Sequence, residues 1–315
     1  MDEPSAATLR DRLPAIAADE LERALALAQP RRPGPPLGSA EAEAIALRNG
    51  WKPVLREMLD ESQLDARRAV FEREGFTTCL GQRFVTHAAG RIDRSGTRKA
   101  EGGGERVVLF VGRDENALRE AAQLERDATL NDRRLGELLG YPRCCVDAFV
   151  GTPRPRTAMQ LLRATQRRTV GLGDALLDVA DLRAFHFVPW TPCTFRCAPS
   201  IEYAARIDGW LGRHHPDFAR DVRVRLRAMR LVLHADVQIA MRGRWDNDVF
   251  AVERAVPVSQ FHPPNVRLAP EAYEAAARLL VALERAGSLR RLHETLSIDG
   301  VDSRAVERAL LLEFE

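Results

Sequence analysis

Four of the five cysteines occur in two tight pairs, and each pair lies at a break in the chain marked by proline. Cys144 and Cys145 are adjacent and follow Pro142 closely. Cys193 and Cys197 are separated by three residues and have prolines on both sides. Thiolates bind zinc and iron–sulfur clusters and act as nucleophiles in redox chemistry. A fold that brings the two pairs together therefore creates one four-thiol site, and this requirement constrains how the chain between them can run.

Two other uses of cysteine compete with such a site. A buried cysteine often behaves as a small hydrophobic residue, which is our interpretation of Cys79 in the segment Thr77–Leu80. Disulfide frameworks are typical of secreted chains, but the acidic start Met1–Glu3 leads into no apolar segment, so we expect no signal peptide. We therefore expect a cytoplasmic protein whose cysteine cluster binds metal or is catalytic. A cofactor-free thiol–disulfide enzyme that uses the adjacent pair stays open as an alternative.

The spacing of the cysteines distinguishes the possible metal centres. Zinc sites usually take cysteines about two to four residues apart, which fits the second pair but not the first. Neighbouring helical residues point about 100° apart, so two adjacent thiolates reach one small ion with difficulty. An iron–sulfur cluster is larger than a single ion and has several iron atoms at its corners, each of which can bind a different thiolate. We predict an iron–sulfur cluster of the 4Fe–4S type, with a structural zinc-binding module in a macromolecular contact as the alternative; the predicted ligands are Cys144, Cys145, Cys193 and Cys197.

The number of protein ligands is open at this point. If only three thiolates bind, an iron corner is left for a substrate, or a thiol is left for chemistry. We therefore expect the cluster to lie at or near the active site of an enzyme, although the sequence names no substrate. His186 lies between Phe185 and Phe187 and can replace a thiolate. A histidine between two aromatic residues is more often a half-buried structural residue, and we favour that interpretation.

Both pairs are predicted to lie at the start of a helix. Gly140 is placed to end one helix, and Pro142 suits the first turn of the next, Arg143–Val150. The adjacent cysteines then lie where the helix dipole favours an ionised thiolate. Ser200 is the expected N-cap of a helix Ile201–Leu211, so the second pair lies in the loop before it.

The two motifs resemble a family catalogued as domain of unknown function 483. That family has a Leu-Gly-Tyr-Pro-x-Cys-Cys element and a downstream Pro-Cys-x-x-x-Cys-x-x-Ser element, and the resemblance spans roughly Arg106 to Ser200. The resemblance implies that the two cysteine pairs form one constellation. It implies no reaction. The matching segments of this chain are Leu139–Phe149 and Pro192–Ser200.

Composition limits the class of protein. The chain has 315 residues, of which 45% are hydrophobic and 29% are charged, as in ordinary globular proteins. No apolar run approaches the roughly 20 residues that a membrane span needs. The 47 basic and 45 acidic residues leave a net charge of only +2, which does not indicate a nucleic-acid-binding protein. A small-molecule substrate is compatible with this composition, and the oligomeric state is open.

We predict an α+β fold that is rich in helices and has a modest mixed or antiparallel sheet. The segment Pro30–Pro36 is rich in proline and glycine and predicts an extended linker. We divide the chain into an N-terminal helix with this linker (1–36), a helical segment (37–76) and a cysteine-cluster domain (77–315).

Hydrophobic periodicity and breaker residues predict the individual elements. The predicted helices are Ala6–Gln29, one or two within Ala40–Glu74, Glu115–Asp127, Asp132–Leu139, Arg143–Val150, Arg156–Arg168, Ile201–Leu211, Pro216–Ala228, Pro270–Ala286 and Ser303–Glu315. The predicted strands are Thr77–His87, Arg106–Gly112, Arg230–Gly243, Asp248–Val256 and Arg290–Ser297.

Two further features are open to several interpretations. Runs of arginine can steer an anionic substrate or RNA, but in an arginine-rich chain we favour a solvated helix face. The histidines His214, His215 and His262 lack the spacing that fixes a metal on one helix face. The arginine runs are Arg154, Arg156, Arg163, Arg167 and Arg168, and then Arg220, Arg223, Arg225, Arg227 and Arg230.

Overall fold

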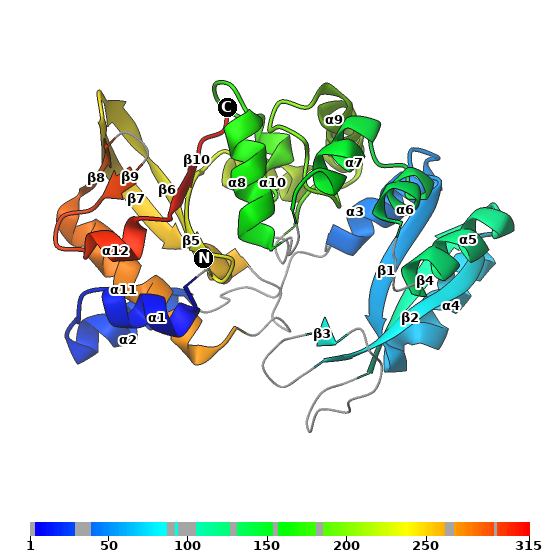
Figure 1. Ribbon diagram of the computed structural model, residues 1–315, viewed down its shortest axis with the longest axis horizontal. Helices are drawn as coiled ribbons and strands as arrows, with labels where there is room; N and C mark the ends of the chain where they lie inside the picture. Colours follow the sequence, from blue (N-terminus) through cyan, green and yellow to red (C-terminus); the bar gives the residue numbers. More distant parts are fainter. Residues whose placement is uncertain are drawn as a thin grey trace. The chain divides into compact units, whose positions relative to one another are not determined.

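The computed structural model describes residues 4–28, 39–86, 92–93, 105–126, 131–153, 157–180, 185–261, 268–292 and 295–315. Its contacts divide the chain into two units (Figure 1). Unit 1 combines Met1–Ser39 with Arg154–Glu315, and unit 2 is the continuous segment Ala40–Pro153. Each unit has its own antiparallel sheet with helices packed on it, which confirms the predicted α+β class.

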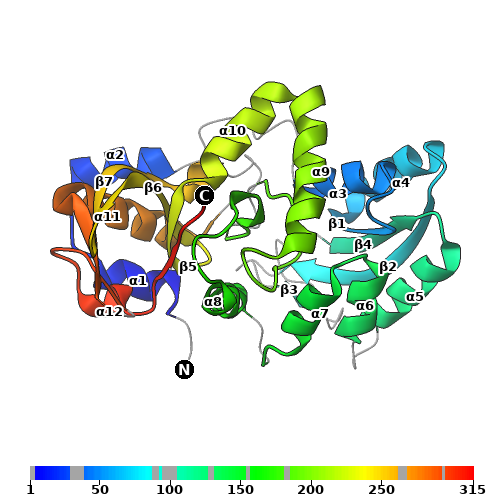
Figure 2. The ribbon, with the colours of Figure 1, turned by 90° about the horizontal axis from the view of Figure 1, so that it is seen from above.

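Unit 2 is a four-stranded sheet covered by helices on both faces. The strands β1 (Val54–Asp60), β2 (Thr77–Thr86), β3 (Ile92–Asp93) and β4 (Glu105–Gly112) pair in the order β1-β4-β2-β3. Helices α3 (Ser39–Arg48) and α4 (Leu64–Arg73) cover one face, and α5 (Glu115–Arg126) and α6 (Asp132–Leu138) cover the other (Figure 2). The run Val107–Val111 of β4 is fully buried because it contributes side chains to both cores.

The strand β1 corrects the prediction of helices through residues 40–74. Pro53 ends the helical region, and the chain continues as a strand from Val54 to Asp60, followed by the short 3₁₀ helix η1 (Glu61–Gln63). Strand β1 pairs with β4 along its whole length. Its sequence contains few β-branched residues, so partnership with β4 rather than local propensity determines its conformation.

Unit 1 is built on a six-stranded antiparallel sheet. Its order is β10-β5-β6-β7-β8-β9, and α11 (Pro270–Ala286) packs on one face. Helices α1 (Ala6–Arg12) and α2 (Ala18–Ala28) in turn pack against α11 (Figure 1). The strands are β5 (Met229–His234), β6 (Val237–Asp246), β7 (Val249–Pro257), β8 (Ser288–Leu292), β9 (Thr295–Ser297) and β10 (Leu310–Leu312).

The N-terminal prediction of one helix is wrong in one respect. Pro14 divides the predicted helix into α1 and α2, because the residue before a proline is driven out of the helical conformation. Leu13 accordingly has an extended backbone with ψ of 150°. The two helices pack on the core of unit 1 through buried Leu9, Leu13 and Ala24. The predicted linker Pro30–Pro36 lies outside the described residues.

Three predictions in the C-terminal region were also wrong in detail. The predicted strand Arg230–Gly243 is the hairpin of β5 and β6, and Arg290–Ser297 is the hairpin of β8 and β9. The predicted helix Ser303–Glu315 is a single turn, α12 (Ser303–Val306), followed by β10. Strand β10 pairs with β5, a partner distant in sequence, so its conformation depends on tertiary contacts.

The remaining elements follow the predicted pattern closely. Helix α7 spans Arg143–Val150 and α11 spans Pro270–Ala286, both as predicted. No helix in the described ranges is long and apolar enough to cross a membrane. The other elements are α8 (Ala158–Arg168), α9 (Ala198–His214), α10 (Pro216–Leu226), and the 3₁₀ helices η2 (Ala175–Leu177) and η3 (Val258–Phe261). The predicted three-part division into 1–36, 37–76 and 77–315 stays a prediction.

Candidate metal centre

The first cysteine pair lies in the first turn of α7. Pro142 is the N-cap, and its carbonyl oxygen accepts hydrogen bonds from the backbone nitrogens of Cys145 (2.9 Å) and Val146 (3.0 Å). The Cys145 side chain is buried, whereas Cys144 is exposed. One thiol therefore faces the protein interior and its neighbour remains accessible from solvent.

The turn before α7 requires a glycine at position 140. Gly140 has a φ of 74°, in the left-handed region that favours glycine. A Cβ added to Gly140 would lie 2.5 Å from Cδ of Pro53. The glycine of the Leu-Gly-Tyr-Pro-x-Cys-Cys element is therefore required both by its backbone conformation and by the close approach of a neighbouring loop.

The buried side chain of Lys52 holds the same turn through a hydrogen bond to its backbone. Lys52 is 2% exposed, and its Nζ donates to the Leu139 carbonyl at 3.1 Å and pairs with Glu43 at 3.0 Å. The ammonium also lies 4.5 Å from the centre of the Tyr141 ring. Desolvation lowers the pKa of Lys52, while Glu43 acts in the opposite direction. Burial raises the pKa of Tyr141, so its hydroxyl stays protonated.

Helix α8 holds the loop that carries the second pair. Arg168 donates through Nε to the carbonyl of Cys193 at 2.8 Å. Thr165 donates to the carbonyl of Pro192 at 2.8 Å, and the hydroxyl of Thr169 accepts from the backbone nitrogen of Phe195 at 2.9 Å. Thr165 and Arg168 lie three residues apart on α8, and Thr169 is the C-cap of that helix, so the C-terminal end of α8 fixes the backbone around Cys193.

Cys197 has a hydrogen-bonded position at the start of α9. It is the N-cap of that helix, and its carbonyl accepts from the backbone nitrogen of Ile201 at 2.9 Å. The hydroxyl of Ser200 lies 3.3 Å from the Cys197 sulfur and donates to it, while Trp190 Nε1 donates to the same hydroxyl at 3.1 Å. The prediction that Ser200 is the N-cap of this helix is therefore wrong. Cys197 is the N-cap, and Ser200 donates a hydrogen bond to its sulfur.

The structure brings the four predicted cysteines together. The Sγ atoms of Cys144, Cys145, Cys193 and Cys197 all lie within 4.8 Å of one another. Cys79 is separate from this group and packs against a core of unit 2, as expected for a small hydrophobic residue. All five cysteines lie in described residues, and none of them forms a disulfide. The group is compatible with metal binding.

The histidines considered from the sequence that lie in the described residues are not members of this group. His186 is 6% exposed and lies outside it. His214 stacks on Trp210 with ring centres 4.1 Å apart, and its Nδ1 lies 2.8 Å from the carbonyl of the same residue. His262 lies outside the described residues. Within the part of the chain that the structure describes, the group therefore consists of thiols alone.

Sequence reasoning missed the residues that position the thiols. Nothing in the motifs identifies Thr165 or Thr169 as partners of the second cysteine loop, because their contacts depend on tertiary packing. Ser200 is the last residue of the second motif, but its sequence position was interpreted as an N-cap. Lys52 did carry a signal: it is one of two lysines in a chain that otherwise uses arginine for its basic residues. A buried position with one carbonyl and one carboxylate suits the compact ammonium better than the planar guanidinium.

Comparison with known proteins identifies one family. Residues 116–214 match the family model described as "Protein of unknown function (DUF483)", which confirms the resemblance seen in the two motifs. The matched segment contains all four clustered cysteines together with the helices α6, α7, α8 and α9. No curated protein and no solved structure matches the chain.

Proposed function

We propose that residues 116–214, the segment that the family model covers, carry a metal centre held by Cys144, Cys145, Cys193 and Cys197. The grouping of their sulfur atoms within 4.8 Å carries this proposal. The close approach of four thiols without a metal contributes little to the stability of the fold. One bound metal ion, in contrast, stabilises all four as thiolates. The Ser200 hydroxyl supports this assignment, because a hydrogen bond donated to a ligand sulfur orients and stabilises that ligand.

The distances favour a single tetrahedral ion, and we assign zinc. A Zn–S bond of about 2.3 Å places tetrahedral ligand sulfurs about 3.8 Å apart. Four sulfurs that all lie within 4.8 Å fit this arrangement. An iron–sulfur cluster puts a core of iron and sulfide between its ligands and holds them farther apart. Four thiolates close the coordination shell, so the zinc has a structural role.

The iron–sulfur cluster predicted from the sequence is the second candidate. It is favoured by the adjacency of Cys144 and Cys145, which one small ion uses less easily than a cluster with several corners. It is also favoured by the exposure of Cys144, since a thiol that faces solvent suits a centre with an accessible corner. In that case the protein is an enzyme with the cluster at or near its active site. Either centre requires reduced thiols, which supports the proposal of a cytoplasmic protein.

Metal analysis and the absorption spectrum of anaerobically purified protein test these candidates. The zinc assignment predicts a colourless protein with one zinc per chain. A brown protein with iron and acid-labile sulfide would replace it with the second candidate. Protein free of metal whose thiols cycle with a disulfide would instead indicate a cofactor-free thiol enzyme.

Single substitutions test the shared ligation. Cys144→Ser, Cys145→Ser, Cys193→Ser and Cys197→Ser should each lower the metal content, because every thiolate contributes to one coordination shell. Cys79→Ser is the matched control and should retain metal. A variant of the four that keeps its metal identifies a thiol that is not a ligand. Equal metal content in all five variants would contradict a shared centre.

A further inference from the structure

A large cavity in unit 1 lies next to the loop of the second cysteine pair. It has a volume of about 990 Å³ and is lined by α8, β10, the α12–β10 connection and parts of β8 and β9. Phe195, between Cys193 and Cys197, and Thr169, which holds its backbone, both line it. A cavity of this volume is in the range that takes small organic ligands.

The charged side chains of this cavity leave an excess of positive charge. Glu313 is already engaged, since it pairs with Arg291 and accepts from Trp245 Nε1 at 2.9 Å. Besides Arg291, three arginines line the wall, and Glu307 is the other carboxylate, so the formal charges of the described lining residues sum to +2. The three arginines are Arg163, Arg167 and Arg308.

Arg167 is the most informative of these arginines. It is exposed on α8, and it makes no ion pair with any described residue. Arg163, Gln166 and Arg167 lie three and four residues apart, so they share the helix face that forms the wall. Gln166 Nε2 donates to the carbonyl of Leu311 at 2.7 Å, and Arg163 donates to the carbonyl of Arg308. These two hydrogen bonds attach α8 to the edge strand β10 and to the connection that precedes it.

The cavity also has apolar side chains that are exposed to solvent. Leu172 lines it and is 45% exposed, and Val170 two residues earlier is 84% exposed. Phe195 and Leu296 contribute further apolar lining. An apolar wall beside convergent cations is typical of a site for an organic anion rather than for a bare ion.

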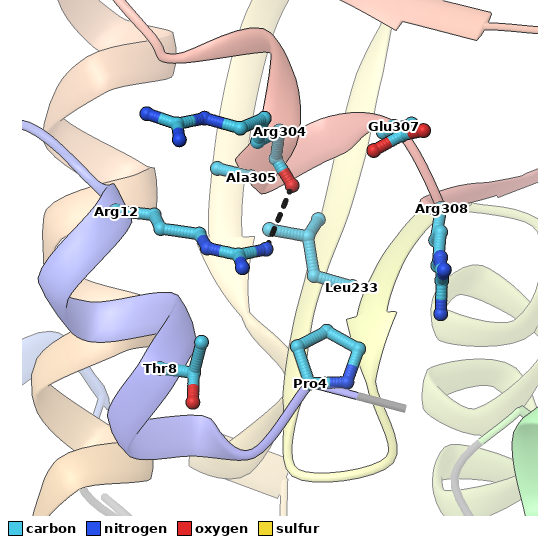
Figure 3. A pocket seen from close by; sticks show the side chains of 8 residues that line it. All are labelled: Pro4, Thr8, Arg12, Leu233, Arg304, Ala305, Glu307 and Arg308. Carbon is cyan, nitrogen blue, oxygen red and sulfur yellow. Dashed lines mark hydrogen bonds between the residues drawn. The ribbon is translucent and has the colours of Figure 1, made fainter. Parts of the chain in front are cut away.

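A second, smaller cavity of unit 1 differs from the larger one in how its arginines are paired. It has a volume of about 230 Å³ and shares Glu307 and Arg308 with the larger cavity. Arg12 and Arg304 lie on one side of it and Arg308 on the other (Figure 3). Arg12 donates to the carbonyl of Arg304 at 3.3 Å, and Arg304 pairs with Asp302 at 2.8 Å. Arg12 and Arg304 therefore already have partners, whereas Arg167 makes no ion pair with any described residue.

We propose that the larger cavity binds an organic phosphate of about mononucleotide size, with Arg167 as a principal contact to the phosphate. A guanidinium matches a phosphate through two parallel hydrogen bonds, and a phosphate dianion matches the surplus charge of the wall. The apolar surface around Leu172 takes the organic part of the ligand. RNA is the less favoured ligand, because these arginines line one cavity instead of following a long surface. The inference does not depend on which metal the cysteines hold.

Equilibrium dialysis of the full chain, as purified with its metal, tests the proposal with AMP, adenosine and inorganic pyrophosphate as probes. AMP should bind with a dissociation constant below about 1 mM, and pyrophosphate should compete with it. Adenosine should bind at least tenfold more weakly, since it lacks the phosphate. The absence of AMP and pyrophosphate binding at about 10 mM, or equal binding of AMP and adenosine, would overturn the proposal.

Substitutions locate the binding in this cavity. Arg167→Gln should weaken AMP binding roughly tenfold, and Arg167→Lys should weaken it less, because the charge stays while the paired hydrogen bonds are lost. Arg220→Gln, an exposed arginine on α10 that pairs with Asp217, is the matched control and should bind AMP like the unsubstituted protein. Unchanged binding by Arg167→Gln would overturn the proposal. Displacement of AMP by a uridine oligonucleotide at far lower nucleotide concentration would replace it with RNA recognition.

Discussion

At the scale of single residues, the positions of the four cysteines depend on neighbouring side chains that do not belong to the thiol group. Lys52 holds the carbonyl of Leu139, and Ser200 supports the sulfur of Cys197. Arg168 and Thr165 hold the carbonyls of Cys193 and Pro192. Thiolates placed by such fixed contacts need little rearrangement when a metal binds, because a held ligand loses little conformational freedom.

Lys52 is predicted to be important for stability through its buried ion pair. Lys52→Met should lower the free energy of unfolding by about 3 kcal/mol, because it leaves Glu43 without its buried cation. The double variant Lys52→Met/Glu43→Gln should recover part of that loss, since it removes the uncompensated charge. Chemical denaturation of the three proteins measures the effect.

An exposed ion pair provides the control for this comparison. Arg119 and Glu115 pair on the surface of α5 with side chains that are 66% and 61% exposed. Arg119→Gln should change the free energy of unfolding by less than about 0.5 kcal/mol. Equal losses for the Lys52 and Arg119 variants would contradict a special role of the buried lysine.

At the scale of elements, the connection between α6 and α7 determines where the first cysteine pair lies. Gly140→Ala should destabilise the protein by more than about 1 kcal/mol, because it combines a left-handed backbone with a contact against Pro53. It should also lower metal retention, since relief of that contact displaces the start of α7. Metal content and thermal melting measure the two effects.

Gly50 is the matched control for Gly140. Its φ is 71°, but no atom lies within 4 Å of an added Cβ. Gly50→Ala should therefore cost only the conformational term of about 1 kcal/mol and should leave the metal content unchanged. Loss of metal in both variants to the same extent would show that general destabilisation, rather than the position of α7, is responsible.

The elements also show what the sequence alone can predict. Helices with clear boundaries, such as α7 after Pro142 and α11 after Ala269, were predicted with their observed ends because local residues determine them. Strands β1 and β10 were predicted as helix because each depends on a strand distant in sequence. The cysteines themselves were found from their spacing. The contacts of Lys52 and α8 could not be found, since they arise only when the segments pack.

At the scale of the whole molecule, the two units differ in how the chain builds them. Unit 2 is one continuous segment with cores on both faces of its sheet. Unit 1 needs both ends of the sequence, because α1 and α2 pack on α11. A continuous segment with its own core has the properties of a domain that folds by itself.

This difference predicts the behaviour of fragments. Residues 40–153 expressed alone should be soluble and should melt in one cooperative transition, because their core is complete. Residues 154–315 without residues 1–39 should expose the face of α11 that contacts Leu9 and should bind a hydrophobic dye. Circular dichroism and dye fluorescence measure these outcomes. A fragment 40–153 without cooperative melting would contradict the independence of unit 2.

The packing of α1 on α11 also has a consequence for synthesis on the ribosome. Helix α1 leaves the ribosome before its partner α11, which follows roughly 250 residues later and takes on the order of 10–50 s at ordinary rates of translation. During that interval unit 2 can complete its fold, while the apolar side chains of α1 and α2 have nothing to pack against. The nascent N-terminus is therefore expected to be a client of chaperones that shield emerging apolar helices, and slower translation would lengthen its exposure.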